Sequence, residues 1–103
     1  MEKTASYDSF AQFYPFYRSE HADRTCRRLH FVGTSLVILV AVSAIASGHY
    51  GLLWLLPVLG YGFAWVGHFY FEKNRPATFK YPFYSFIGDF VMYKDIWTGK
   101  IRF

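Results

Sequence analysis

Three histidines and one glutamate are the residues of this chain whose chemistry and spacing indicate a functional site. They are His21, His30, His68 and Glu72. Imidazole and carboxylate groups both bind divalent first-row metals, and imidazole suits iron, zinc or copper. Glu72 follows His68 by four residues, so on a helix its carboxylate either binds the same ion or orients the imidazole. The spacing also allows a simpler interpretation, in which each histidine bonds a carbonyl group or reaches toward water at a membrane surface.

Two apolar segments carry two of these histidines. Residues 29–47 and 52–71 are nineteen and twenty residues long, and they contain His30 and His68. As helices they would each measure about 30 Å, the thickness of a bilayer core. An imidazole inside such a segment is costly, so it is a functional-site hypothesis by default.

The composition favours a small membrane protein. The chain has 103 residues, of which 53% are hydrophobic, 23% aromatic and 17% charged, so we expect one membrane domain over residues 1–103. The net charge of +4 lies in two clusters that flank the apolar segments, which argues against a nucleic-acid-binding stripe. The single cysteine excludes an intrachain disulfide. The polar first residues do not form a signal peptide.

The placement of positive charge predicts the orientation in the membrane. Basic residues precede the first segment and follow the second, and the turn between the segments has none, so both termini should face the cytoplasm. His30 and His68 then lie at the same depth. His21 can join them only if the helix breaks between residues 22 and 25, because nine residues put it half a turn out of phase with His30. His49 lies in the distant turn and is excluded from the site.

Two further segments are predicted to be amphipathic helices at the membrane surface. Residues 8–20 contain Pro15, which favours a kink or a late start. Residues 82–97 should bury an apolar face at the interface or against the apolar pair, and that face consists of Phe83, Phe86, Ile87, Phe90 and Val91. Asp89 either belongs to the site or faces lipid headgroups, and we favour the second interpretation. The expected fold is all-α, a small integral membrane bundle in which a two-span hairpin is flanked by these helices.

Three stretches of the chain resemble a known family. They are EH at residues 20–21, RLHFVGT at 28–34 and, most specifically, FAWVGHFYFEKNRPA at 63–77, which are similar to the 2-hydroxy fatty acid dioxygenase family of small membrane proteins. The resemblance covers most of the chain. It implies an Fe(II)-dependent enzyme of α-oxidation, which shortens a 2-hydroxy fatty acid by one carbon with dioxygen. The histidines that hold its iron correspond to His21, His30 and His68.

The chain also departs from the eukaryotic pattern of that family. Eukaryotic members are longer, have more spans and carry an asparagine-containing stretch after the first histidine, where this chain has Ala-Asp-Arg-Thr at residues 22–25. The resemblance is therefore to a short bacterial branch, which implies a location in the bacterial inner membrane.

These observations lead to one main functional hypothesis. Fe(II) would be held by the three histidines with Glu72 as ligand or neighbour, and Glu72 and Arg75 would be catalytic. Arg28 or Arg75 would orient the carboxylate of a fatty-acyl substrate, whose chain would lie along the apolar pair, and O2 would be the second substrate. Self-association is expected, because two spans scarcely enclose a lipid chain. The alternatives are a non-enzymatic membrane scaffold or lipid-binding protein, and a zinc-dependent lipid hydrolase.

Overall fold

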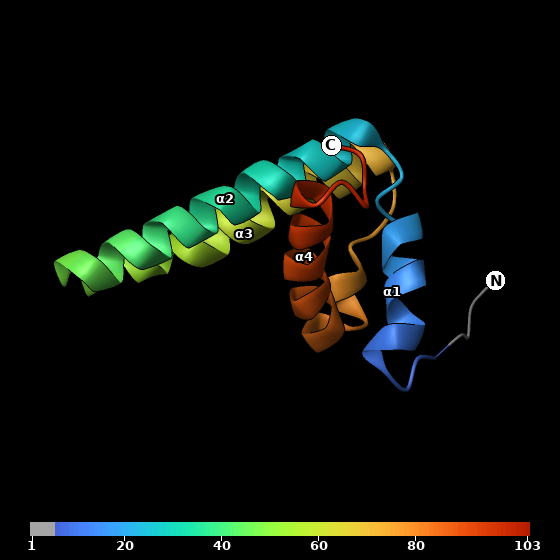
Figure 1. Cartoon of the computed structure of the whole chain (residues 1–103), viewed down its shortest axis with the longest axis horizontal. Helices are drawn as coiled ribbons and strands as arrows, with labels where there is room; N and C mark the ends of the chain where they lie inside the picture. The colour runs from blue at the N-terminus through green and yellow to red at the C-terminus, as the bar shows by residue number, and fades with distance from the viewer. Residues whose placement is uncertain (1–5) are drawn as a thin grey trace.

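The computed structural model describes residues 6–103, which fold entirely into helices, turns and loops without a strand. The all-α prediction is thus confirmed for this part of the chain. In order, the elements are α1 (Phe10–Ser19), α2 (Arg24–Ser47), the 3₁₀ helix η1 (Tyr50–Trp54), α3 (Leu55–Val66), the π-helical turn η2 (Gly67–Glu72), the 3₁₀ turn η3 (Ala77–Phe79) and α4 (Pro82–Trp97). Figure 1 shows α2 and α3 side by side, with α4 running across one end of the pair and α1 next to that end.

The helices α2 and α3 form the long axis of the molecule. Two segments, Arg24–Ser47 and Tyr50–Glu72, are long and apolar enough to cross a membrane by length and composition. The first ends at Gly48, whose positive φ of 75° reverses the chain and is readily adopted only by glycine. Gly33 allows close approach of the two helices, because a Cβ there would lie 2.9 Å from the Cβ of Phe63.

The helix α1 ends just before the first site histidine. Its N-terminus is capped by the Ser9 hydroxyl, which accepts from the Gln12 amide at 3.2 Å. The helix begins at Phe10 and continues through Pro15, so the expected late start is wrong. The predicted break is present, but at residues 20–23 rather than 22–25, and α2 begins where the Asp23 carboxylate accepts from the backbone N–H of Cys26 at 2.9 Å.

The helix α4 packs with a different face from the one predicted by its apolar residues. Phe83, Phe86 and Phe90 are exposed, so of the two placements expected for this face, packing against the apolar pair does not hold for these three residues, and placement at a membrane interface stays a prediction. The buried residues are Ser85, Gly88, Met92, Asp95 and Ile96. A small inward face is needed because the Tyr17 ring lies against Gly88, where a Cβ would come within 3.0 Å of it. The phenylalanines therefore face the surroundings of the protein.

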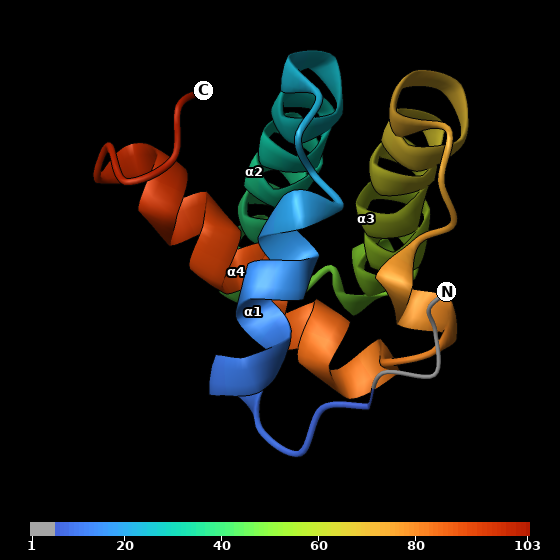
Figure 2. The same cartoon turned by 90° about the vertical axis from the view of Figure 1, so that its right-hand side faces the viewer.

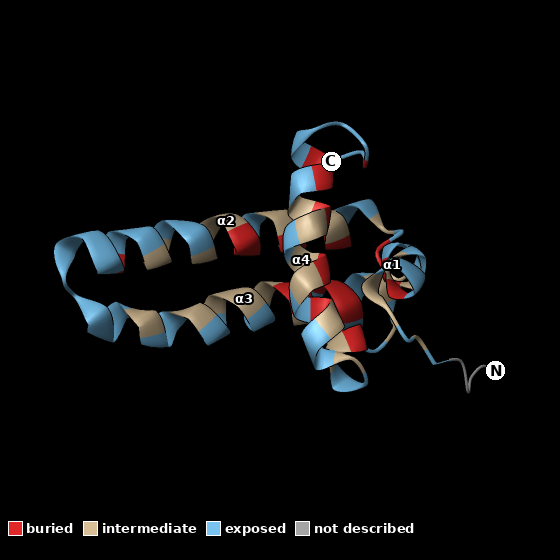
Figure 3. Ribbon diagram, turned by 60° about the horizontal axis from the view of Figure 1, so that its bottom comes forward, coloured by how far each residue is buried: buried red, intermediate tan, exposed pale blue. Residues whose placement is uncertain are grey.

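Two regions differ in their packing, as Figure 3 shows by colour. We call α1, α4, η2, η3 and the adjoining end of α2 the head, and residues 38–62 the distal half. Figure 2 looks onto the head and shows α1 crossing in front of α4, beside the ends of α2 and α3. The core of the head consists of Phe13, Tyr17, Ala77, Met92, Ile96 and Ile101. The core therefore lies at the same end of the molecule as the site.

Candidate metal centre

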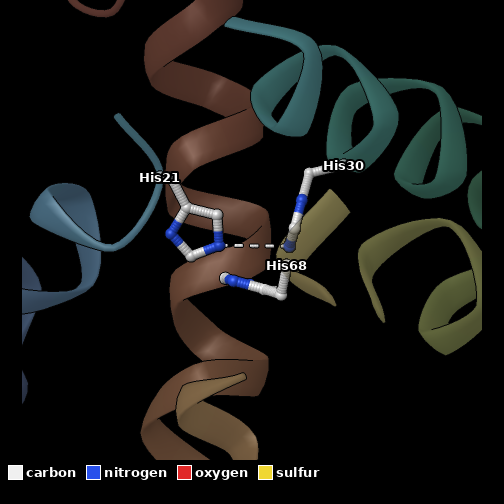
Figure 4. Close-up of side chains that lie close together, drawn as sticks. All are labelled: His21, His30 and His68. Carbon is white, nitrogen blue, oxygen red and sulfur yellow. Dashed lines mark hydrogen bonds between the residues drawn. The ribbon is translucent and has the colours of Figure 1, made fainter. Parts of the chain in front are cut away.

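Three imidazoles meet inside the head (Figure 4). His21, His30 and His68 are 2%, 5% and 2% exposed. One nitrogen from each lies within 4.8 Å of the other two, and the Nε2 atoms of His21 and His30 are 3.1 Å apart. Residues far apart in the sequence thus converge on one point.

The Nδ1 atom of each imidazole faces an oxygen acceptor. Nδ1 of His21 lies 2.6 Å from the carbonyl oxygen of Tyr17, and Nδ1 of His30 lies 2.9 Å from that of Cys26. For His68 the acceptor is the side-chain Oδ1 of Asn74, at 2.7 Å. Because a carbonyl oxygen only accepts, the proton of each neutral ring is assigned to Nδ1. The Nε2 lone pairs of all three rings are then available for a ligand.

This arrangement of nitrogens fits a metal ion. Two unprotonated Nε2 atoms 3.1 Å apart repel each other unless they share a cation. Nitrogens bound to one ion at about 2.0–2.1 Å are themselves about 3 Å apart. Metal-binding histidines usually donate their other ring N–H to a carbonyl or carboxylate group, as all three do here. Burial, together with His30 and His68, holds the pKa of His21 well below its usual range, so this ring is neutral and competent to bind.

The local structure of each element explains this convergence. His21 follows the end of α1, in the non-helical break before α2. On a continuous helix it would point away from His30, and the break allows it to point toward His30. His68 lies in η2, where the helix widens into a π turn, a feature that is frequent at functional sites. Gly67 lets this turn contact the start of α2, because a Cβ there would lie 3.0 Å from the Cys26 Sγ.

The other predicted site residues lie outside the group of three imidazoles. The Glu72 carboxylate accepts from the backbone N–H of Asp23, so it holds the start of α2 beside η2. The guanidinium of Arg75 lies over the ring of Phe79 at 5.5 Å, and that of Arg28 over Phe103 at 4.8 Å. The cavities beside the histidines are lined by neither arginine, nor by Glu72. His49 is exposed in the turn after α2, as expected.

Asn74 is a residue of the site that the sequence did not indicate. Besides accepting from His68, it donates its side-chain amide to the Glu20 carbonyl at 3.2 Å. It thereby joins η2 to the segment that carries His21. Lys73 precedes it with a positive φ of 59°, and that turn directs the chain back toward His68. The signals in the sequence were the polar residues that follow the second apolar segment and the family resemblance over residues 63–77, which includes Asn74.

Asp89 also belongs to the site, so its interpretation as a residue facing headgroups is wrong. Its carboxylate accepts from the Tyr17 hydroxyl, and the Tyr17 ring stacks on His21 with centroids 4.1 Å apart. Burial raises the pKa of the Asp89 carboxyl to about 6, although the hydrogen bond from Tyr17 opposes the rise. Asp89 is therefore mostly ionised at neutral pH, beside the histidines.

Two cavities adjoin the histidines. A small one, of 20 Å³, is lined by all three imidazoles with Tyr17, Ser85, Asp89 and their neighbours, and it has room for about one water-sized group. A larger one, of 440 Å³, is mostly apolar and extends from His30 between α2, α3 and α4. The cavities share His30, Tyr61, Ala64, Thr78 and Asp89. The polar site thus opens onto an apolar space of the size that holds small ligands.

The family model described as 2-hydroxy-palmitic acid dioxygenase Mpo1-like matches residues 7–101. The chain belongs to this Mpo1-like family. Comparisons with curated proteins and with solved structures give no significant match. The Mpo1-like match spans all three histidines, Asn74 and Asp89. The family description suggests dioxygenase activity on a 2-hydroxy fatty acid, and the three buried imidazoles suggest a metal.

Proposed function

We propose that this protein is a membrane-embedded, Fe(II)-dependent dioxygenase that shortens 2-hydroxy fatty acids by one carbon. The observation that carries the proposal is the set of three buried imidazoles, each with its Nδ1 atom on an oxygen acceptor and with one nitrogen within 4.8 Å of a nitrogen of each of the other two. The family description supports the reaction and the substrate class. The reaction balances as RCH(OH)COOH + O2 → RCOOH + CO2 + H2O, in which the bond between C1 and C2 breaks and four electrons pass to dioxygen.

His21, His30 and His68 would hold the iron through Nε2. Three protein ligands leave positions open, and iron supplies the redox chemistry that lets dioxygen react with an organic substrate. The protein holds the imidazoles neutral and oriented through the acceptors on Nδ1. Glu72 would stabilise the position of α2 relative to η2 through its bond to Asp23. We do not assign a catalytic role to Arg75, whose guanidinium stacks on Phe79.

The apolar cavity would take the acyl chain of the substrate. It begins at His30 and Asp89 and continues past Val37, Ala41 and Pro57. A fatty acid placed in it would have its polar end near the imidazoles and its chain among apolar side chains. The chemistry of the cavity therefore changes along its length as that of a fatty acid does.

The long helices would insert into a membrane, with the head at the cytoplasmic surface. Leu39, Val42 and Ile45 are each 62% exposed, and Trp54 is 84% exposed. An apolar surface of this extent is unfavourable in water and suits lipid. The flanking positive charges favour the cytoplasmic side for both termini. A substrate held in the bilayer could then reach the site without entering water.

Oxygen uptake by the Fe(II)-loaded protein tests the proposal. With 2-hydroxypalmitate we expect consumption of one O2 per molecule and formation of the fifteen-carbon acid, whereas palmitate should give neither. The His49→Ala variant should match the wild type, because His49 lies outside the site. Turnover of a membrane lipid by the zinc-loaded protein without oxygen would favour a hydrolase instead. Iron binding without any turnover would overturn the assignment as an enzyme of this class.

A further inference from the structure

Two polar side chains of α4 face the site without a role in holding a metal. Ser85 and Asp89 are four residues apart, so they lie one above the other on the same face of the helix. Both line the small cavity together with the three histidines, and Asp89 also lines the apolar cavity. They therefore lie where the polar end of a substrate would meet the imidazoles.

Ser85 is the more unusual of the two. Its side chain is 4% exposed, and its Oγ atom has no hydrogen-bond partner among the residues that the structure describes. A buried hydroxyl without a partner lowers stability, and alanine would fill the same position without that cost. A serine here is therefore better explained by a bound molecule than by packing.

The Asp89 carboxylate is held in position and can accept further hydrogen bonds. One carboxylate oxygen accepts from Tyr17, whose ring is stacked on His21, so the carboxylate is held relative to the site. An ionised carboxylate has several acceptor positions and no donor. It would repel the carboxylate of a fatty acid but would accept strongly from a hydroxyl group.

We propose that Ser85 and Asp89 together recognise the 2-hydroxyl group of the substrate. The substrate hydroxyl donates to the Asp89 carboxylate, and the Ser85 hydroxyl donates to the oxygen of the same group. A plain fatty acid lacks this group, so it leaves the Ser85 hydroxyl without a partner and Asp89 with only its hydrogen bond from Tyr17. The two residues are thus positioning residues that select hydroxylated over non-hydroxylated fatty acids. This inference rests on the proposed function and adds the residues that set its selectivity.

The test compares the affinities of two ligands rather than turnover. Binding of 2-hydroxypalmitate and of palmitate is measured without oxygen, to the metal-loaded protein in nanodiscs of neutral lipid. The wild type should prefer the hydroxylated acid. Ser85→Ala should lower this preference about threefold to tenfold, and Asp89→Asn should lower it about tenfold or more, because its hydrogen bond involves a charge. Palmitate should bind as before to Ser85→Ala, and as before or more tightly to Asp89→Asn, which removes a charge that repels its carboxylate.

Ser35→Ala is the matched control. The Ser35 hydroxyl is bonded to the Tyr93 hydroxyl at 2.9 Å and lines neither cavity, so the ligand preference should be unchanged. Ser85→Ala should fold and retain its metal, because no hydrogen bond within the protein is lost.

Unchanged preference in both cavity variants, or equal loss of affinity for both acids, would overturn the inference and leave the proposed function standing. If the wild type itself binds the two acids equally, the substrate class of the proposed function is wrong.

Discussion

The head and the distal half use similar side chains in opposite ways. In the distal half, residues such as Leu39 and Val58 are exposed, and the helices contact mainly each other. In the head, aromatic rings such as those of Phe13 and Tyr17 are buried and enclose polar groups. This difference is what the proposed insertion of the distal half into a membrane would require. Lipid can surround the distal half, whereas the head has to build its own interior, and that interior is where a metal could be held.

The largest expected effect is the loss of membrane association when charge is placed in the distal half. The double variant Leu39→Lys/Val58→Lys places two ammonium groups on exposed apolar positions, at a cost of about 2.5–3.5 kcal/mol each near the centre of a bilayer. We expect the protein to leave the membrane fraction after an alkaline wash. Leu39→Ala/Val58→Ala should remain membrane-bound. Retention of the lysine variant would show that the distal half does not lie in lipid.

Loss of Asn74 should lower the affinity of the head for a metal ion without affecting the distal half. Asn74→Ala removes the acceptor for the His68 Nδ1–H and the bond to the Glu20 carbonyl. Removal of such an outer partner lowers metal affinity about 10–100-fold, which anaerobic titration with Fe(II) would measure. Gln12→Ala is the control, because Gln12 bonds only at the start of α1. Equal affinity in the wild type and Asn74→Ala would mean that His68 needs no support.

Gly67 and Gly62 lie in the same helical segment, but only Gly67 is tightly packed, so substitutions at the two positions can be compared. A Cβ on Gly67 would lie 3.0 Å from the Cys26 Sγ and 3.2 Å from its Cα, whereas a Cβ on Gly62 meets nothing within 4 Å. Gly67→Ala should destabilise the protein by about 1–3 kcal/mol. Gly62→Ala should be neutral or stabilise it by up to about 1 kcal/mol. Thermal unfolding in detergent would show the difference, and equal midpoints for the two variants would contradict the close contact.

The last prediction is a pH dependence of stability from Asp89. An aspartate in an unfolded chain has a pKa near 3.9, and in this fold the pKa of Asp89 is raised to about 6. Between these values the folded protein binds more protons, so this group lowers stability as the pH rises from about 4 to 6. Asp89→Asn removes that penalty. The variant should unfold at a higher temperature than the wild type at pH 7.5, and the difference should shrink toward pH 4; a constant difference would contradict the burial of the charge.

Much of the molecule followed from the sequence, because its strongest signals are local. The lengths of the apolar segments predicted helices long enough to span a membrane, and Asp23 marked the break that lets His21 face His30. The packing of α4 could not be predicted in the same way. Periodicity favours burial of the phenylalanine face, but a neighbouring lipid phase would remove that preference, and the fit of Tyr17 against Gly88 then decides the rotation of the helix.

Two residues of the site, Asn74 and Asp89, were not predicted from the sequence, for related reasons. Asn74 reaches His68 only because η2 is a π turn that ends in a residue with positive φ, and no periodic pattern predicts either feature. Asp89 looked like a surface charge because it is an acidic residue in a helix that was predicted to lie at the membrane surface. Its role depends on Tyr17, which comes from a different helix.

The central claim is that the head of this protein holds one metal ion through three histidines. Its most direct test is an anaerobic titration of the purified protein with Fe(II), in which the wild type should bind one ion per chain. His21→Ala, His30→Ala and His68→Ala should each lower the affinity by about 100-fold or more, since each removes a ligand. His49→Ala should bind as the wild type does. Stoichiometric binding of unchanged affinity in all three site variants would contradict the account.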